Sequence, residues 1–343
     1  MISLQRRQSS RPGPALVRSV GILGLGSALP DKIVTNADLE ALVETSDDWI
    51  RTRTGIRERR IADPGTCSSG LGELAARRAL ADAGVRPEEL DLIIVATVTP
   101  DTPMPATACR IQKRLGAHRA GAFDLSIACS GFAYAMTVAQ QFVAGGGCER
   151  VLVIGVDVLS TITNWADRST CVLFGDAGGA AVLGPVAEGS GILGFHFGAD
   201  GGGAELLKIR APGGMVPGYT PELSREDFCI QMSGRGVFRF AVQMIGDAAI
   251  AALNKAGVHP DEVDLFVPHQ ANLRIIEAAA QRLNISMDRV FMNVQHYGNT
   301  SSGSIPLALA DARDQGRIRP GDTVVAVGFG GGLAWCALVI RWT

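Results

Sequence analysis

The chain has 343 residues, 47% of them hydrophobic and 19% charged, with a formal net charge of -2. This composition excludes disorder over most of the length, and it gives no reason to expect nucleic acid or a membrane as a main partner. No run of about 18 uninterrupted apolar residues indicates a membrane span. A chain of this length exceeds what one hydrophobic core usually serves, so two packed halves are expected.

The first eighteen residues carry four arginines but no acidic residue. Such a stretch resembles an organelle transit peptide in composition, but Pro12 and Pro14 would interrupt an amphipathic helix. We therefore expect residues 1–19 to be a disordered head. None of the seven cysteines forms a C-x-x-C pair, so no metal site is expected. In the absence of a secretory signal, we expect reduced thiols and a cytoplasmic protein.

One pattern occurs twice, about half the chain apart. AGVRPEELDL at 83–92 corresponds to AGVHPDEVDL at 256–265, an offset of 173 residues, and VLVIG at 151–155 faces VVAVG at 324–328 at the same offset. One residue closer, the tripeptide that begins at Cys129 faces the one that begins at Ser301. The order is kept along the chain, which indicates two copies of one α/β unit.

In each copy, a helical pattern ends in Ala-Gly-Val and a short apolar run follows, as expected of a buried strand. Strands alternating with amphipathic helices indicate mainly parallel sheets covered on both faces. We place the boundary between the copies in the Gly-rich stretch 185–191, giving halves of 20–188 and 189–343, and expect a loop-rich excursion at 196–217. The predicted strands are 90–98, 123–128, 151–156, 263–269 and 323–329, and the clearest helices are 131–143 and 272–283.

Cys129 lies at the predicted turn between strand 123–128 and helix 131–143. A thiol at a helix N-terminus meets the positive end of the helix dipole and unpaired backbone N–H groups, which favour the nucleophilic thiolate. The same N–H groups can hold an oxyanion when a thioester is attacked. The alternative is a buried structural cysteine, which is the common role of this residue type.

Two further residues stand where the second copy would approach Cys129. His269 ends a strand and precedes a helix, and Asn299 lies in a loop in the region that pairs with Cys129. If the copies are related by a pseudo-two-fold axis, their strand ends meet near the centre, and both side chains would converge on Cys129. Taken alone, a histidine is more often a core or surface residue, and an asparagine after glycine is usually a turn former.

Six motifs resemble those of the β-ketoacyl-acyl-carrier-protein synthase III family, which has the thiolase-like fold. They occur in the family's order from about Val20 to the C-terminus. The resemblance implies an α/β fold of two duplicated halves in a five-layered α-β-α-β-α arrangement, the first carrying the nucleophile and the second the histidine and asparagine. The motifs are SDDWIRTRTGIRERR at 46–60, DLSIACSGF around Cys129, DRSTCVLFGD at 167–176, VPHQAN around His269, YGNTSSGSIP around Asn299 and GFGGGLAW at 328–335.

The resemblance also implies a role for each candidate residue. The catalytic triad would be Cys129, His269 and Asn299, with the N–H groups of Cys129 and Gly331 as the oxyanion hole. Coenzyme A would be bound by Trp49, Arg53, Arg168 and Asn272. Arg239 and Arg274 would meet the phosphopantetheine arm or the carrier protein, and Met104 would limit the acyl pocket.

The implied reaction begins with transfer of an acyl group from coenzyme A to Cys129. Malonyl carrier protein then loses carbon dioxide, and His269 and Asn299 would each donate a hydrogen bond to the resulting enolate oxygen. The carbanion attacks the acyl-cysteine, which initiates fatty acid synthesis. Acyl-CoA and acyl carrier protein are the implied partners, the implied assembly is a homodimer, and no metal or redox cofactor is required.

Two other functions stay open at the level of sequence. One is a priming ketosynthase of a polyketide pathway with a different starter, and the other is an acyltransferase that loads Cys129 but never condenses. Thiolysis is disfavoured because Gly328 stands where thiolases have a second cysteine. A dinucleotide dehydrogenase is excluded because Gly24 and Gly26 do not extend to a full G-x-G-x-x-G and Pro30 follows.

Overall fold

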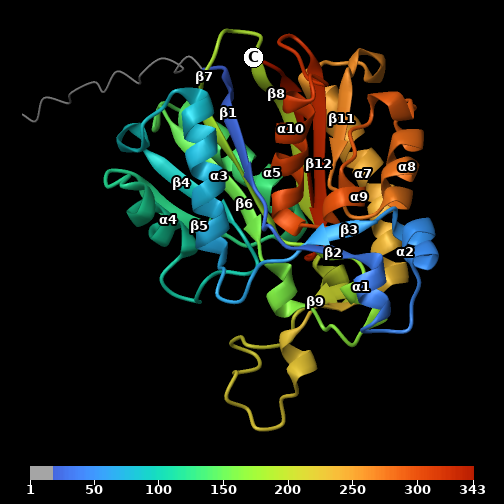
Figure 1. Cartoon of the computed structure of the whole chain (residues 1–343). Helices are drawn as coiled ribbons and strands as arrows, with labels where there is room; N and C mark the ends of the chain where they lie inside the picture. The colour runs from blue at the N-terminus through green and yellow to red at the C-terminus, as the bar shows by residue number, and fades with distance from the viewer. Residues whose placement is uncertain (1–17) are drawn as a thin grey trace, which may run out of the picture.

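Runs of apolar residues form the central strands of two mixed sheets. The structure is a computed structural model that describes residues 18–343 (Figure 1). In the first sheet β4 is parallel to β5 and β6, whereas β7 is antiparallel to both β6 and β1. The strand order is β1 (Val20–Ala28), β7 (Ala177–Pro185), β6 (Val151–Asp157), β4 (Leu92–Ala96) and β5 (Gly121–Leu125).

The second sheet repeats this arrangement. Its order is β8 (Gly191–Ala199), β13 (Ala334–Arg341), β12 (Thr323–Gly330) and β11 (Leu265–Pro268). β11 is parallel to β12, and the other two pairs are antiparallel. An isolated parallel bridge from Phe266 to Val290 stands where β5 stands in the first sheet. The prediction of mainly parallel sheets is therefore wrong for the strands beyond β6 and β12. In the second sheet the short connection 331–333 between β12 and β13 permits only a hairpin.

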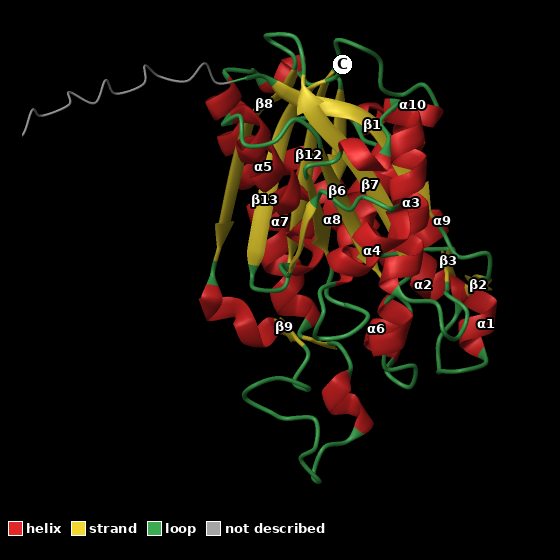
Figure 2. Ribbon diagram, turned by 90° about the vertical axis from the view of Figure 1, so that its left-hand side faces the viewer, coloured by secondary structure: helices red, strands yellow, loops and turns green. Residues whose placement is uncertain are grey.

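Six long helices complete five layers, which confirms the expected fold class (Figures 1 and 2). Between the sheets lie α5 (Gly131–Ala144) and α10 (Ser304–Asp314), which contact strands of both sheets. The outer face of the first sheet is covered by α3 (Ser68–Ala83) and α4 (Thr107–Leu115), and that of the second by α7 (Gly234–Ala256) and α8 (Leu273–Arg282). The apolar residues that these layers share are buried in three clusters.

Within residues 18–343, α7 alone is long and apolar enough to pass a length-and-composition test for a membrane span. It carries Arg239 and Asp247, and it packs against β8, β12 and β13. Its apolar residues therefore have a place in the core of the second half.

Shorter elements form the region around the site. They are β2 (Ile33–Thr35), α1 (Asn36–Glu40), α2 (Asp47–Thr54), β3 (Glu58–Arg60), α6 (Arg168–Cys171), β9 (Leu207–Lys208), β10 (Gln231–Met232) and α9 (Val294–Tyr297). The predicted excursion at 196–217 is partly wrong, because residues 196–199 belong to β8 and pair with β13. The loop after β9 extends away from the body of the molecule (Figure 1) and exposes Met215 and Tyr219.

The strands of the first sheet end at Pro185 and those of the second begin at Gly191, on either side of the expected boundary at 188 and 189. The predicted disordered head, residues 1–19, lies outside the described residues except for its last two positions.

The two halves keep the offset of 173 residues at the central turns, where the sequence comparison predicts 172. Single 3-10 turns, η2 (Ala128–Ser130) and η8 (Ser301–Gly303), lead into α5 and α10. The non-glycine residues Ala128 and Ser301 have φ of 48° and 50°, so they are equivalent at the offset of 173. The predicted pairing of Cys129 with Ser301 is therefore wrong, and Cys129 corresponds to Ser302.

Candidate active site

Cys129 lies in η2, between β5 and the first turn of α5, and is buried. Its Sγ lies 3.5 Å from Ser301 Oγ in the turn of the other half. The end of β12 approaches it closely, since a Cβ on Gly330 would lie 2.8 Å from the backbone nitrogen of Cys129. Only glycine therefore fits at position 330, and its small size keeps the space in front of the sulfur open.

The equivalent place in the other copy is filled. Asp157 stands at the position of Gly330 and accepts hydrogen bonds from the backbone nitrogen and hydroxyl of Ser302, at 3.1 and 2.6 Å. Ser302 is in turn the equivalent of Cys129. The buried carboxylate thus closes the second copy of the site and ties the two halves together. The offset of 173 residues was the sequence signal that relates Asp157 to Gly330 and Ser302 to Cys129. The tripeptides were instead aligned at an offset of 172, so the second relation was not found.

Burial decides the ionisation of Cys129. It raises the pKa of the thiol to about 12, against the lowering effect of the hydrogen bond to Ser301. The helix N-terminus is expected to favour the thiolate, but the loss of solvation on burial is the largest effect on this pKa and acts in the opposite direction. With its pKa raised in this way, the neutral thiol is the main form at neutral pH.

The rate at which Cys129 reacts should consequently rise with pH. Because only the thiolate attacks, the reactive fraction increases about tenfold per pH unit while the pH stays below the pKa. We expect alkylation of Cys129 by iodoacetamide to accelerate continuously from pH 6 to pH 9, as followed by peptide mass mapping. The exposed Cys109, mapped in the same samples, reports the pH dependence of the reagent. A plateau at Cys129 below pH 8 would contradict the raised pKa.

His269 follows β11 and is almost fully buried. Its Nδ1 lies 2.5 Å from Ser304 Oγ, and its ring meets the edge of Phe329 with centroids 5.1 Å apart. The other ring nitrogen, Nε2, is buried without a hydrogen-bond partner among residues 18–343. Burial lowers the pKa of the imidazole to about 3, so the ring is neutral at physiological pH.

Asn299 is held by both its backbone and its side chain. Its backbone nitrogen donates to Leu173 O at 2.8 Å and its carbonyl accepts from Gly175 N at 3.0 Å. Its side-chain Oδ1 accepts from Ser301 N at 2.9 Å. The acceptor end of the amide is therefore occupied, and the Nδ2 end has no hydrogen-bond partner in the described part of the chain.

These three side chains line one cavity of about 310 Å³, which continues past Phe329 and Phe238 to Trp49, Arg53, Asn272 and Arg274. Residues from both halves thus meet at the carboxyl ends of β11 and β12. Asn272 caps α8 by accepting from Arg274 N at 2.9 Å, and its Nδ2 donates to Arg53 O at 3.1 Å. This bond joins α8 to the C-terminal turn of α2 at the mouth of the cavity.

Trp49 lies between two guanidinium groups at that mouth. The centre of its ring is 5.0 Å from Arg53 Cζ and 4.9 Å from Arg168 Cζ. Arg168 begins α6 and is oriented by a 2.8 Å hydrogen bond from Nη1 to Glu44 O. A flat aromatic face bordered by two cations suits a ring system that carries phosphates.

A second cavity of about 380 Å³ also borders Cys129. Its walls are mostly apolar and include Leu159, Ile162 and Ile230. Gly331, the predicted oxyanion donor, lines this cavity, whereas Gly330 makes the close approach to Cys129 described above. Cys129 therefore borders both a cavity with a polar mouth and a mostly apolar cavity.

Two predicted residues do not reach the site in this chain. Met104 is 85% exposed and lines neither cavity at Cys129, so it does not limit the acyl space of its own chain. Arg239 is exposed on α7 and lies outside the cavity lining, although its neighbour Phe238 is part of it.

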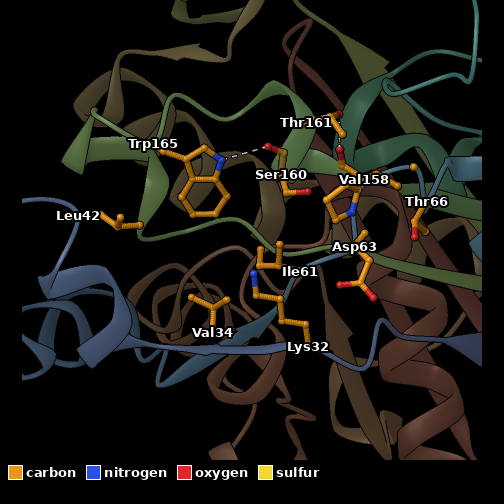
Figure 3. A pocket seen from close by; sticks show the side chains of 13 residues that line it. Lys32, Val34, Leu42, Ile61, Asp63, Thr66, Val158, Ser160, Thr161 and Trp165 are labelled. Carbon is orange, nitrogen blue, oxygen red and sulfur yellow. Dashed lines mark hydrogen bonds between the residues drawn. The ribbon is translucent and has the colours of Figure 1, made fainter.

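A third cavity, of about 400 Å³, lies apart from the predicted residues (Figure 3). Trp165, Ile61 and Leu42 form its apolar side, and Lys32 and Asp63 stand at its rim. The indole nitrogen of Trp165 donates to Ser160 O at 3.2 Å. None of the residues predicted to be catalytic or to bind coenzyme A lines this cavity.

Comparison with known families matches two models to the chain. One describes 3-oxoacyl-[acyl-carrier-protein] synthase III and matches residues 123–201, and the other describes the C-terminal part of the same enzyme and matches residues 253–342. A relative from Symbiobacterium thermophilum, a beta-ketoacyl-[acyl-carrier-protein] synthase III, is 54% identical over 95% of this chain and 99% of its own length. A relative of the same name from Caldanaerobacter subterraneus is 52% identical over 95% of this chain and 98% of its own length.

Solved structures agree with this comparison. The β-ketoacyl-[acyl-carrier-protein] synthase III of Thermus thermophilus is 47% identical, covers 94% of this chain and 99% of its own, and superposes with a TM-score of 0.89. The priming β-ketosynthase of the R1128 polyketide biosynthetic pathway is 38% identical, covers 96% and 99% of the two chains, and has a TM-score of 0.90.

Proposed function

This chain belongs to the β-ketoacyl-[acyl-carrier-protein] synthase III family, and we propose that Cys129, His269 and Asn299 carry its reaction. It is a condensing acyltransferase of fatty acid biosynthesis. It joins an acyl group from acyl-CoA to the malonyl group on acyl carrier protein, with loss of carbon dioxide. The geometry around Cys129 accounts for each step of this chemistry.

In the first half-reaction the thiolate of Cys129 attacks the thioester carbonyl of acyl-CoA. The backbone N–H groups of Cys129 and Gly331 hold the oxyanion, and the tetrahedral adduct collapses to acyl-cysteine and the thiolate of coenzyme A. The apolar cavity beyond Cys129 receives the acyl chain. Because the resting thiol is neutral, its proton leaves before or during attack, and the proton ends on the departing coenzyme A.

In the second half-reaction malonyl carrier protein occupies the mouth that coenzyme A has left. Breaking the bond to the carboxylate releases carbon dioxide and leaves an enolate on the thioester. His269 Nε2–H and Asn299 Nδ2–H donate hydrogen bonds to the enolate oxygen, where charge develops. The carbanion then attacks the acyl-cysteine carbonyl, and the Cys129 thiolate leaves as the ketoacyl product forms. A proton from solvent restores the neutral thiol and replaces the one that left with coenzyme A. No electrons are exchanged with an outside acceptor, so we propose that no redox cofactor is needed.

The observation that carries this proposal is that a buried thiol shares one cavity with Nε2 of His269 and Nδ2 of Asn299, neither of which has a hydrogen-bond partner within residues 18–343. The test is a two-step assay followed by intact-protein mass spectrometry. Incubation with a panel of acyl-CoA thioesters should add one acyl mass at Cys129. Subsequent malonyl carrier protein should remove it and yield ketoacyl carrier protein. An acyl-enzyme that persists without product would mean acyl transfer alone.

Coenzyme A binding is proposed at Trp49, Arg53, Arg168 and Asn272. Arg274, which lines the same cavity, is proposed to meet the phosphopantetheine arm or the carrier protein. Replacing Trp49 by alanine removes the stacking face, and we expect KM for acyl-CoA to rise about tenfold with little change in kcat, since stacking on an aromatic ring is worth about 1–3 kcal/mol. Steady-state kinetics at varied acyl-CoA check this. Trp165→Ala is the matched control, because it truncates the same side chain in the separate cavity of Figure 3. Equal KM changes in both variants would contradict the assignment of Trp49 to coenzyme A binding.

A homodimer is proposed from two surface features. Within residues 18–343, β5 is an edge strand with β4 as its only neighbour in the sheet, and its five residues are partly exposed or exposed. Such an edge is available to pair with another strand. Met104 is an exposed apolar side chain that a partner would cover. Pairing of the β5 edges of two copies would bury the strand and direct Met104 toward the partner rather than toward its own cavity. Cytoplasmic location is proposed with the same family assignment.

A further inference from the structure

The Nδ1 atom of His269 is in contact with the side chain of Ser304. Its hydroxyl lies 2.5 Å from His269 Nδ1, and both residues are about 1% exposed. Ser304 is the first residue of α10, so its position is fixed by a central helix. A neutral imidazole carries one proton, on Nδ1 or on Nε2, and the partner of one nitrogen determines which. Ser304 is therefore placed to determine which ring nitrogen faces the cavity as a donor.

Either Nδ1–H or the Ser304 hydroxyl can be the donor in this hydrogen bond. The number of buried polar groups left without a partner differs between the two cases. If Nδ1–H donated to Ser304, the serine proton would need an acceptor, and its hydroxyl has no other partner among residues 18–343. If the hydroxyl donates to Nδ1, the serine proton and the Nδ1 lone pair are both satisfied. The first arrangement leaves two buried groups unpaired among residues 18–343, the serine O–H and the Nε2 lone pair, whereas the second leaves only Nε2–H. Because each unpaired buried polar group costs about 1–3 kcal/mol, the second arrangement is favoured. The ring proton then stands on Nε2.

Asn299 follows the same arrangement. Its Oδ1 accepts from Ser301 N at 2.9 Å, just as Nδ1 of His269 accepts from the Ser304 hydroxyl. In both residues the acceptor end is occupied by a donor from the segment that begins α10, which leaves a donor toward the cavity. Nε2 is buried and unpaired among the described residues, as expected of a donor whose partner is a substrate oxygen.

We propose that Ser304 is a positioning residue that holds His269 as the Nε2–H tautomer, so that His269 serves decarboxylation and condensation rather than the acylation of Cys129. This inference rests on the proposed function, since it assigns a source to the donor that His269 supplies there. Ser304 itself touches no substrate. Its effect is confined to the half-reaction in which an enolate oxygen needs two donors.

The test measures the two half-reactions separately in Ser304→Ala, Ser304→Thr and His269→Ala. With the hydroxyl removed, the condensation of preformed acyl-enzyme with malonyl carrier protein should fall about 10–100-fold. This is less than the factor of about 10²–10³ for complete loss of an oxyanion donor, because a fraction of the imidazoles still carries the proton on Nε2. Acylation of Cys129 and KM for acyl-CoA should stay at wild-type values. Ser304→Thr keeps the hydroxyl and should restore most of the condensation rate. Thr323→Val, which removes another buried hydroxyl at the far end of β12, should change neither half-reaction.

Two results would overturn the inference. One is condensation at the wild-type rate in Ser304→Ala, and the other is an equal loss of acylation and condensation, which marks a structural role. If the alanine variant does not fold, ¹⁵N spectra of the wild-type enzyme labelled at its five histidines decide, with His269→Ala assigning the signal. A protonated Nε2 and unprotonated Nδ1 support the proposal, and the reverse refutes it. Failure of the proposed function is distinct, because the wild type would then make no ketoacyl product.

Discussion

Replacing Cys129 with alanine is expected to abolish both half-reactions, with condensation from acyl-CoA falling at least about 10⁴-fold. The acyl group would have no covalent carrier, so the reaction would need direct attack of the enolate on a thioester that is not held at the oxyanion hole. The variant should also gain no mass from acyl-CoA in the two-step assay. Because the side chain is buried beside Gly330 and removal of a sulfur leaves only a small cavity, the fold should persist.

Cys148→Ala is the matched control for this prediction. Cys148 is half-buried at the edge of the central core and lines neither cavity at the site, so its removal should leave acyl loading and condensation intact. If Cys129→Ala still condensed acyl-CoA at the wild-type rate, the covalent mechanism would be wrong. If the acyl group from acyl-CoA were found on another cysteine, that cysteine and not Cys129 would be the nucleophile.

The halves and their central strands were predictable because the physical signals are local. A fully apolar run such as that of β4, and its repeat at β11 after the same Ala-Gly-Val and proline, can only be buried strands in equivalent places. The direction of the outer strands was not predictable in the same way. β7, with the sequence AGGAAVLGP, has little side-chain pattern, and its antiparallel pairing depends on the path of the chain before it.

At the site, the residue types predicted the chemistry well, but they did not predict the environment of each side chain. The turn at Cys129 follows from the strand and helix on either side, but its pKa depends on burial by segments far away in the sequence. Ser304 gave no signal, because a serine at a helix start is ordinarily read as a capping residue. The structure instead turns its hydroxyl toward His269, which lies 35 positions earlier in the chain.

Asn299→Asp should separate the two half-reactions most sharply. The change preserves the shape of the side chain and the acceptor that receives Ser301 N, but it replaces the Nδ2 donor by a carboxylate oxygen. The enolate oxygen would then face a negative charge in place of a hydrogen bond. Loss of one such donor costs about 10²–10³ in rate, and the added repulsion should bring condensation down by at least about 10³-fold. Acylation of Cys129 should continue, since the oxyanion of that step lies on backbone N–H groups.

The expected observation is therefore an acyl-enzyme that forms and then accumulates when malonyl carrier protein is added. Asn254→Asp, on the exposed side of α7, introduces the same charge away from the cavity and should behave as wild type. Condensation within tenfold of wild type in Asn299→Asp would show that the amide is not a donor to the enolate. Loss of acylation as well would show that the carboxylate disturbs Cys129 itself. Accumulation without product supports the assignment of Asn299 to the second half-reaction, because it leaves the nucleophile working and stops only the step that needs a donor at the enolate oxygen.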